Sequence, residues 1–238
     1  MRRTVWFTVV ALLCWSAPQA LAETSKSSMF EFHVGSYEPA IDEQFTNTTP
    51  YADVFGQESP LLFGFHTDRQ LWQGFGSLAV GVGARYGSVS GKAQLEDGTA
   101  SSDTTELHLL PLTASVVYRF DVLQNRVDIP IVPYGKAGLN YTLWWVFNGR
   151  GEVANSWGLD GEGHTGAGGT MGWFASGGVQ LHLDFFDAEM AAEFDTESGV
   201  NNSYLFAEYT TSEVNDFGSD ESMELSSDHL SFGLMFEF

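Results

Sequence analysis

Residues 77–86, SLAVGVGARY, alternate at every step between two kinds of side chain. The even-numbered positions carry the larger apolar groups, and the odd-numbered positions are small or polar. The first set is Leu78, Val80, Val82, Ala84 and Tyr86, and the second is Ser77, Ala79, Gly81, Gly83 and Arg85. Successive side chains of a β-strand point to opposite faces. The stretch therefore predicts a strand with one apolar face and one small or polar face.

The same alternation recurs along the chain. It is found in eight segments, residues 28–36, 60–67, 75–88, 105–120, 131–146, 170–186, 202–212 and 228–238. A tilted strand crosses a bilayer in about 9–11 residues, and most of these segments reach that length. The sequence therefore predicts an all-β fold, namely a transmembrane antiparallel up-and-down β-barrel with eight strands.

The connections between these segments alternate in length. Those after the first, third, fifth and seventh segments are long and rich in Gly, Asp, Ser and Glu; they are residues 37–59, 89–104, 147–169 and 213–227. Those after the second and fourth segments, residues 68–74 and 121–130, are short. Long outer loops and short periplasmic turns are typical of outer-membrane barrels. An even number of strands also places both chain ends on one side.

One connection is longer than this pattern predicts. Residues 187–201, DAEMAAEFDTESGVN, occupy the place of a periplasmic turn. Asp187 is a suitable helix cap, and Met190 and Phe194 follow at i,i+4 spacing. We therefore expect a helical turn against the base of the barrel.

One segment also changes phase within itself. Leu107 and Leu109 fall on the opposite face from the apolar residues that follow them in residues 105–120. Pro111 stands at the change and lacks a backbone N–H group. We therefore expect a β-bulge at Pro111.

The N-terminus predicts export. Residues 1–22 combine two arginines, a short apolar stretch and the A-x-A cleavage site Ala20–Ala22, as in a Sec-type signal peptide. The apolar stretch is too short for a membrane-spanning helix. We therefore divide the chain into a signal peptide, residues 1–22, and a barrel domain, residues 23–238. The single cysteine, Cys14, lies in the part expected to be removed, which excludes disulfides and a cysteine nucleophile.

Composition excludes other classes of protein. Lys and Arg number 10 against 31 Asp and Glu, for a net charge of −21, which argues against nucleic acid as a partner. A chain that is 43% hydrophobic and 17% charged is too apolar to be disordered. A soluble β-sandwich would also alternate. Aromatic residues at the predicted strand ends favour the membrane barrel instead, namely Tyr86, Tyr118, Trp144, Trp145 and Trp173.

Several stretches resemble known barrels. The C-terminal LSFGLMFEF, with Phe232, Phe236 and Phe238, is similar to the assembly signal of outer-membrane β-barrels. Residues 118–121, YRFD, and 132–139, VPYGKAGL, resemble small eight-stranded barrels of the OmpA-transmembrane-domain and OmpW type. The wider run VYRFDVL…PIVPYGKAGLNYTLWW, with GVNNSYLFAEY, resembles an uncharacterised family of outer-membrane barrel proteins.

The resemblance covers essentially all of the chain after the signal peptide. It implies the outer membrane of a Gram-negative type of cell, contact with outer-membrane lipids and insertion by the barrel-assembly machinery. It implies no reaction and no cofactor.

Charged residues fall on the inward face of several strands. The cations are Arg85, Arg119 and Lys136, and the acids are Glu31, Asp184, Glu208 and Glu237. An eight-stranded barrel is just wide enough to be filled by side chains, and charges inside it must be paired. We therefore expect a structural ion-pair cluster that seals the lumen. The alternative is a narrow pore in which these pairs exchange partners.

Catalysis has little support in the sequence. His33, His66, His182 and His229 are inward by parity, and Ser176 and Asp184 share a face with His182. A base beside a nucleophile would suit a lipid-modifying barrel enzyme. Inward serines and same-face pairs are common in any alternating strand, however. We therefore expect no enzyme, no catalytic residue and no cofactor.

The predicted outer loops are strongly acidic. Residues 37–59 and 213–227 contain several acids and no Lys or Arg. Neither has the spacing of a calcium-binding loop, so we expect no dedicated metal site. The alternative to a simply solvated acidic surface is that divalent cations bridge these loops to lipid headgroups. The leading functional hypothesis is a non-enzymatic barrel, structural or surface-interacting through these loops. A small pore or hydrophobic-ligand conduit is the alternative, ahead of a lipid-modifying enzyme.

Overall fold

The computed structural model describes most of the chain that follows the predicted signal peptide. The described residues are 28–56, 58–94, 100–157, 163–186, 195–219 and 222–238. The signal peptide predicted over residues 1–22 lies outside them. Eight long strands form the barrel: β1 (Ser28–Ser36), β2 (Leu61–Gly74), β3 (Gly76–Gln94), β4 (Ala100–Arg119), β5 (Ile131–Phe147), β8 (Ala167–His182), β9 (Asn202–Val214) and β10 (Ser227–Glu237).

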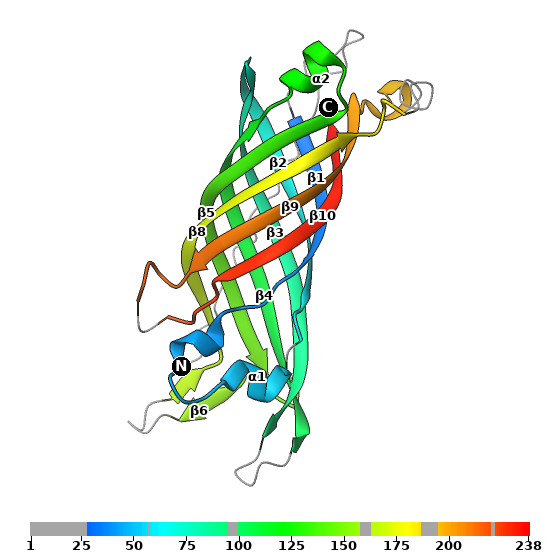
Figure 1. Ribbon diagram of the computed structural model, residues 1–238. Helices are drawn as coiled ribbons and strands as arrows, with labels where there is room; N and C mark the ends of the chain where they lie inside the picture. The colour runs from blue at the N-terminus through cyan, green and yellow to red at the C-terminus, as the bar shows by residue number, and fades with distance from the viewer. Residues whose placement is uncertain (1–27, 57, 95–99, 158–162, 187–194, 220–221) are drawn as a thin grey trace, which may run out of the picture.

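These strands confirm the predicted architecture. They form a closed ring in the order β1-β10-β9-β8-β5-β4-β3-β2, and every pair is antiparallel (Figure 1). The ring closes where β1 pairs with β10, from Met29 opposite Glu237 to Gly35 opposite Ser231. Two short strands, β6 (Asn155–Trp157) and β7 (Gly163–Thr165), form a separate hairpin. The chain is thus an eight-stranded up-and-down barrel.

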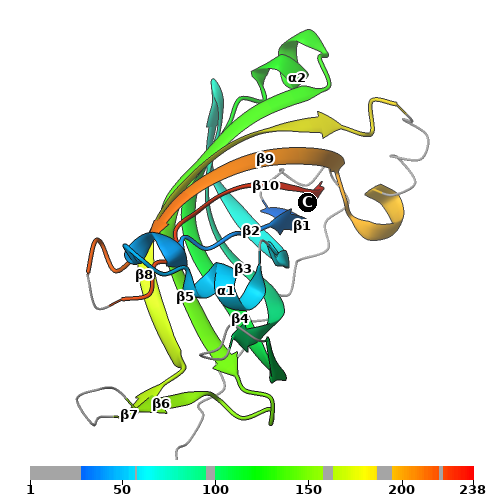
Figure 2. The same cartoon turned by 60° about the horizontal axis from the view of Figure 1, so that its bottom comes forward.

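The two ends of the barrel differ. At one, the turn end, the connections β2–β3, β4–β5 and β8–β9 lie with α2 (Val122–Val127) and the C-terminus (Figure 1). At the other, the loop end, lie the hairpin β6–β7 and the β1–β2 connection, which contains the 3₁₀ helix η1 (Ile41–Gln44) and α1 (Pro50–Phe55). Figure 2 brings the loop end forward and shows η1 and α1 lying across it.

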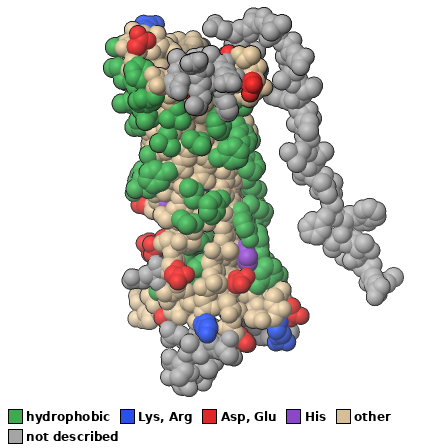
Figure 3. Space-filling model, turned by 90° about the vertical axis from the view of Figure 1, so that its right-hand side faces the viewer, with side chains coloured by type: hydrophobic (Ala, Val, Ile, Leu, Met, Phe, Trp, Pro, Cys, Tyr) green, Lys and Arg blue, Asp and Glu red, His purple; other side chains and the backbone are tan. Residues whose placement is uncertain are grey.

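The outer wall is apolar over its middle part. Phe63, Val82 and Phe232 leave 62%, 57% and 54% of their surface exposed. On the face drawn in Figure 3, green apolar side chains are spread along this wall, whereas most acidic side chains lie toward the loop end. An outer wall with this many exposed apolar side chains, the apolar band, needs a bilayer rather than water around it. The barrel is therefore built to span a membrane. No helix among the described residues has the length and hydropathy needed to cross a membrane.

Strand β2 is longer than its alternation predicts. We expect a strand over residues 60–67 and a turn over 68–74, but β2 continues to Gly74 and the turn is reduced to Phe75. The strand continues because Asp68 and Gln70 occupy inward positions in register with His66. Polar residues at the end of a strand resemble a turn in sequence, although here they face the lumen.

The expected bulge at Pro111 is wrong. Strand β4 pairs with β5 without a register shift from Glu106 to Arg119. Leu107 and Leu109 lie on the same inward face as Pro111 and are buried. Their phase differs because the loop-end part of the lumen is lined by apolar side chains, so apolar residues occupy inward positions there.

Two other predicted connections differ in detail. The turn over residues 121–130 contains the short helix α2. The predicted strand 170–186 ends at His182, so Asp184 belongs to the turn that follows. The helical turn predicted around Asp187 falls largely on residues 187–194, which lie outside the described residues. The loop-end hairpin β3–β4 is longer than expected, because its strands extend to Gln94 and from Ala100.

Candidate functional site: the lumen and its two ends

Lys136 is the shared ion-pair partner of two carboxylates inside the lumen. Its Nζ lies 2.6 Å from Glu31 Oε2 and 3.2 Å from Glu208 Oε2, and all three side chains are buried. Lys136 is on β5 and Glu31 on β1, which are opposite each other in the eight-stranded ring. The ion pair therefore crosses the full width of the lumen. One cation here balances two carboxylates.

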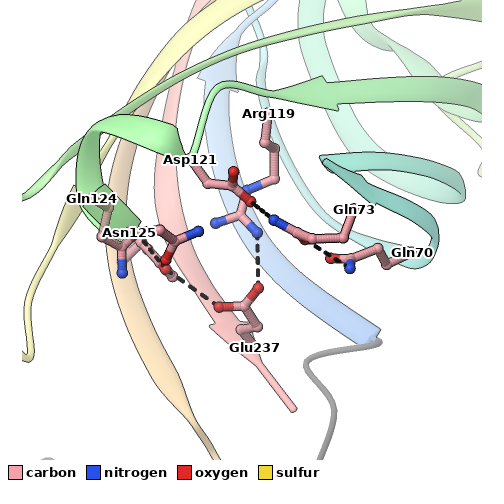
Figure 4. Close-up of a pocket in the computed structure, with 8 residues that line it drawn as sticks. Gln70, Gln73, Arg119, Asp121, Gln124, Asn125 and Glu237 are labelled. Carbon is pink, nitrogen blue, oxygen red and sulfur yellow. Dashed lines mark hydrogen bonds and ion pairs between the residues drawn. The ribbon is translucent and has the colours of Figure 1, made fainter. Parts of the chain in front are cut away.

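Arg119 forms a second crossing nearer the turn end. Its Nη1 lies 3.0 Å from Glu237 Oε1 (Figure 4), and its Nε donates to Gln180 Oε1 at 2.9 Å. Asn202 Nδ2 donates to the second oxygen of Glu237 at 2.7 Å. Strands β4 and β10 are also opposite in the ring. Arg119 is only 2% exposed, so this layer also fills the barrel from wall to wall.

The third predicted cation, Arg85, has a different partner. Its Nη1 lies 2.7 Å from His229 Nε2, and both residues are buried. A guanidinium has no acceptor atom, so Arg85 donates and the imidazole nitrogen accepts. Among the described residues no carboxylate forms an ion pair with Arg85. Of the predicted cluster, the structure therefore brings five residues into two crossing ion-pair groups and sets Arg85 beside them.

Asp184 lies at the turn-end edge of the Arg119 group, to which His182 and Asn202 link it. It lies beyond the end of β8, where its Oδ2 is 3.5 Å from His182 Nε2 and its carboxylate faces the Ser203 N–H. His182 Nε2 also lies 2.9 Å from Asn202 Oδ1. Ser176 is six residues away on the same strand, about 20 Å at the rise of an extended chain. Ser176, His182 and Asp184 therefore do not form one site.

A buried polar group lies on β2, and the sequence predicts one of its members, His66, to face inward. His66 Nε2 lies 2.9 Å from Asp68 Oδ1 and 3.3 Å from Ser115 Oγ. Both contacts are made by the same ring nitrogen, whereas a proton relay to serine needs one at each nitrogen. Gly81 stands opposite, where a Cβ would lie 1.9 Å from Asp68 Oδ1. Residue type and parity predict an inward His66, whereas the turn predicted over residues 68–74 includes Asp68, which the structure places on β2 and in the lumen.

Apolar side chains close the lumen at the loop end. This group, the loop-end plug, consists of Tyr37, Tyr51, Leu62, Val89, Leu107, Leu109, Val214 and Leu225. The Tyr37 hydroxyl donates to the Leu225 carbonyl oxygen. The plug therefore joins inward strand residues to the loops folded over them.

The β1–β2 connection is held tightly over the plug. Asp42 accepts the N–H groups of Tyr51 and Ala52 at 2.6 and 3.0 Å, which fixes the start of α1. Gly91 lets α1 approach β3, since a Cβ there would lie 2.0 Å from the Val54 carbonyl oxygen. These contacts fix the β1–β2 connection over the loop-end plug, and we call this connection the lid.

Tyr51 belongs to this lid and stays protonated. Burial and nearby carboxylates, Glu38 first among them, raise the pKa of its hydroxyl above the ordinary value. The hydroxyl donates to the Glu58 carbonyl oxygen at 2.8 Å.

We expect Tyr37→Phe to lower the free energy of unfolding by about 1–2 kcal/mol, because it leaves the buried Leu225 carbonyl without its donor. Urea titration of the refolded barrel measures this. Tyr209→Phe is the matched control, since Tyr209 is 52% exposed on the wall. Equal midpoints for the two variants would show that the Tyr37 hydroxyl does not hold the lid.

Several loop acids have structural partners. Asp216 accepts the Met171 N–H at 2.7 Å, and Glu213 accepts Trp173 Nε1 at 2.7 Å. Asn215 Nδ2 donates to Glu224 at 3.1 Å. Other acids of the same end, among them Glu43, are exposed. Within the described part of the chain, no group of three or more His, Cys, Asp or Glu side chains is arranged to hold a metal ion.

The aromatic residues of the predicted assembly signal share one face. Phe232 lies on the outward side of β10, Phe236 falls on the same side by parity, and Phe238 directly follows the strand. Phe232 and Phe238 are 54% and 39% exposed. Trp144 behaves differently from the other predicted interface aromatics, since it is inward and packs against the loop-end plug.

No family model and no curated protein matches the chain. Among solved structures, it is similar to neisserial surface protein A, with 15% identity and a TM-score of 0.47 over 90% of this chain and 98% of that one. It is also similar to Ail, the attachment invasion locus protein of Yersinia pestis, in complex with the heparin analogue sucrose octasulfate. That match has 10% identity and a TM-score of 0.40 over 89% of this chain and 97% of the other.

Proposed function

We propose that the protein is a non-enzymatic outer-membrane barrel that acts through the surface of its loop end while its lumen stays closed. The observation that supports this is the filling of the lumen at successive levels. Arg119 with Glu237 and Lys136 with Glu31 cross it, and the loop-end plug closes the remaining part. A solute would have to break buried ion pairs and displace the lid, which is costly.

The orientation follows the usual arrangement of outer-membrane barrels, with short turns in the periplasm and long loops outside. The turn end, with Phe238, would then face the periplasm. The outward aromatic face of β10 suits recognition by the barrel-assembly machinery, and the apolar wall suits outer-membrane lipids.

The loop-end surface would present negative charge to the outside. Glu38, Glu43, Asp53 and Glu58 are exposed, and residues 37–59 contain no Lys or Arg to neutralise them. Such a surface favours cationic partners and repels anionic ones. Divalent cations shared between these carboxylates and lipid phosphates are the simplest partner of this kind.

Planar-bilayer recording tests the closed lumen. We expect the wild-type barrel to show no steady conductance, because the two charge crossings and the loop-end plug occupy its lumen. Arg119→Ala removes one crossing and is expected to give intermittent leak. A steady, ohmic channel from the wild type would overturn the proposal and favour the pore. Lipid A mass spectra that change when the protein is expressed would instead favour a lipid-modifying enzyme.

A further inference from the structure

A cluster of aromatic rings lies on the outer face of the wall, toward the loop end. Three rings from neighbouring strands are nearly parallel, namely Tyr86 on β3, His108 on β4 and Trp145 on β5. The ring centroids of His108 and Trp145 are 5.4 Å apart with 5° between the planes, and those of His108 and Tyr86 are 6.0 Å apart with 22° between the planes. Phe147 packs edge-on against His108 at 5.1 Å. Side chains from three strands therefore form one aromatic cluster.

Polar groups that can bind hydroxyls lie within the same cluster. Ser88 is opposite His108 in the β3–β4 ladder and is exposed. Glu106 is opposite Phe147, and its half-exposed carboxylate lies 3.5 Å from His108 Nε2. The Tyr86 hydroxyl lies 2.8 Å from His108 Nδ1. The imidazole thus holds the phenol and the carboxylate at fixed places, and the carboxylate keeps lone pairs for a further donor.

The cluster begins where the apolar band ends. On β4 the outward residues change from Leu112 and Leu110 to His108 and Glu106 toward the loop end. On β3 the outward residues beyond Tyr86 are polar. Aromatic side chains at this level of a membrane protein lie among the lipid headgroups. With the loop end outside, as proposed above, the cluster faces the headgroups of the outer leaflet.

The composition of the cluster fits a sugar ring. The C–H groups of a sugar are attracted to the negative face of an aromatic ring, and its hydroxyls donate to carboxylates. An acyl chain at this place would cover the Glu106 carboxylate without giving it a donor, and a phosphate would be repelled by it. A saccharide satisfies both the rings and the carboxylate.

We propose that this cluster binds the saccharide headgroup of a glycolipid in the outer leaflet of the same membrane. We call it the ring patch, and it consists of Tyr86, Ser88, Glu106, His108, Trp145 and Phe147. Sugar C–H groups would pack on the rings of Trp145 and Tyr86, and sugar hydroxyls would bond Glu106 and Ser88. The acyl chains of the lipid would lie along the apolar band, which continues directly from the patch. The proposal rests on the orientation proposed above and is independent of the closed lumen.

Native mass spectrometry of the barrel released from phosphatidylcholine nanodiscs tests this. The nanodiscs contain either a diacylglycerol with a maltose headgroup or phosphatidylglycerol with the same acyl chains. We expect the barrel to retain the maltosyl lipid about tenfold more than phosphatidylglycerol, because only the sugar can contact both the rings and Glu106. The indole N–H resonance of Trp145 should shift with the maltosyl lipid alone, which locates the site.

Trp145→Ala removes the largest ring of the patch, and we expect it to abolish the preference for the maltosyl lipid. Trp173→Ala is the matched control, since Trp173 is an outward tryptophan on β8, 40% exposed and outside the ring patch.

Equal retention of the two lipids by the wild type would overturn the proposal, even if Trp145→Ala failed to fold. An unchanged preference in Trp145→Ala would also overturn it. Binding of free maltose without a preference for the maltosyl lipid would overturn the choice of a lipid in the same membrane. Planar-bilayer recording tests the closed lumen separately, so failure of this proposal and failure of the proposed function are distinguishable.

Discussion

The Lys136→Met variant is expected to lose about 3–5 kcal/mol of its free energy of unfolding, the usual cost of breaking a buried ion pair. Methionine fills a similar volume, so the loss reports charge rather than a cavity. Without the ammonium group, Glu31 and Glu208 remain buried as two carboxylates that previously shared one cation at 2.6 and 3.2 Å. Urea titration in lipid vesicles, followed by tryptophan fluorescence, measures the change.

Lys92→Met provides the matched control, because Lys92 is exposed toward the loop end of β3. A triple variant that adds Glu31→Gln and Glu208→Gln to Lys136→Met should recover much of the lost stability, since no unpaired charge remains. Wild-type stability in the single variant would mean that water, rather than the ion pair, solvates these carboxylates.

Val82→Arg is expected to impair insertion by about 2–4 kcal/mol, the cost of an arginine on the lipid face near the bilayer midplane. Val82 is 57% exposed on the apolar band and lies opposite Thr67 and Ala114 in the neighbouring strands. An arginine at this site has no partner and no water. The folded fraction after refolding into vesicles, separated on an unboiled gel, measures the effect.

Ser90→Arg is the control for depth. Ser90 is on the same strand and the same face, but beyond Tyr86 the outward residues become Ser88, Ser90 and Lys92. Arginine at this polar level should be tolerated. Equal loss in both variants would mean that the band is not the membrane-facing surface. Lumen positions such as Gln180 are unsuitable controls, because Gln180 bonds Arg119.

Alternation alone predicts the number of strands and the direction of most side chains. SLAVGVGARY places Val82 outward and Arg85 inward, as the structure has them. Parity also places Glu31, Lys136, Glu208 and Glu237 in the lumen. These assignments succeed because a two-residue period is a local property of the chain.

The partners of these charges depend on barrel closure, which no local pattern contains. Lys136 contacts Glu31 because β1 and β5 are opposite in the ring, more than one hundred residues apart in sequence. The inward leucines of β4 have a similar cause. Leu107 and Leu109 look out of phase until the β1–β2 connection folds over the lumen and gives them apolar neighbours.

Thiol accessibility tests whether a wall in contact with lipid surrounds a lumen without continuous water. If the signal peptide is removed as predicted, the chain has no cysteine, so single substitutions report cleanly. Ser90→Cys, Val82→Cys and Ser115→Cys place a thiol on the polar outer face, on the apolar band and in the lumen beside His66. In lipid vesicles, a small charged thiol reagent should modify the first variant rapidly and the other two only after unfolding. Modification of Ser115→Cys as fast as Ser90→Cys would rule out a closed barrel, because the lumen would then be open to water.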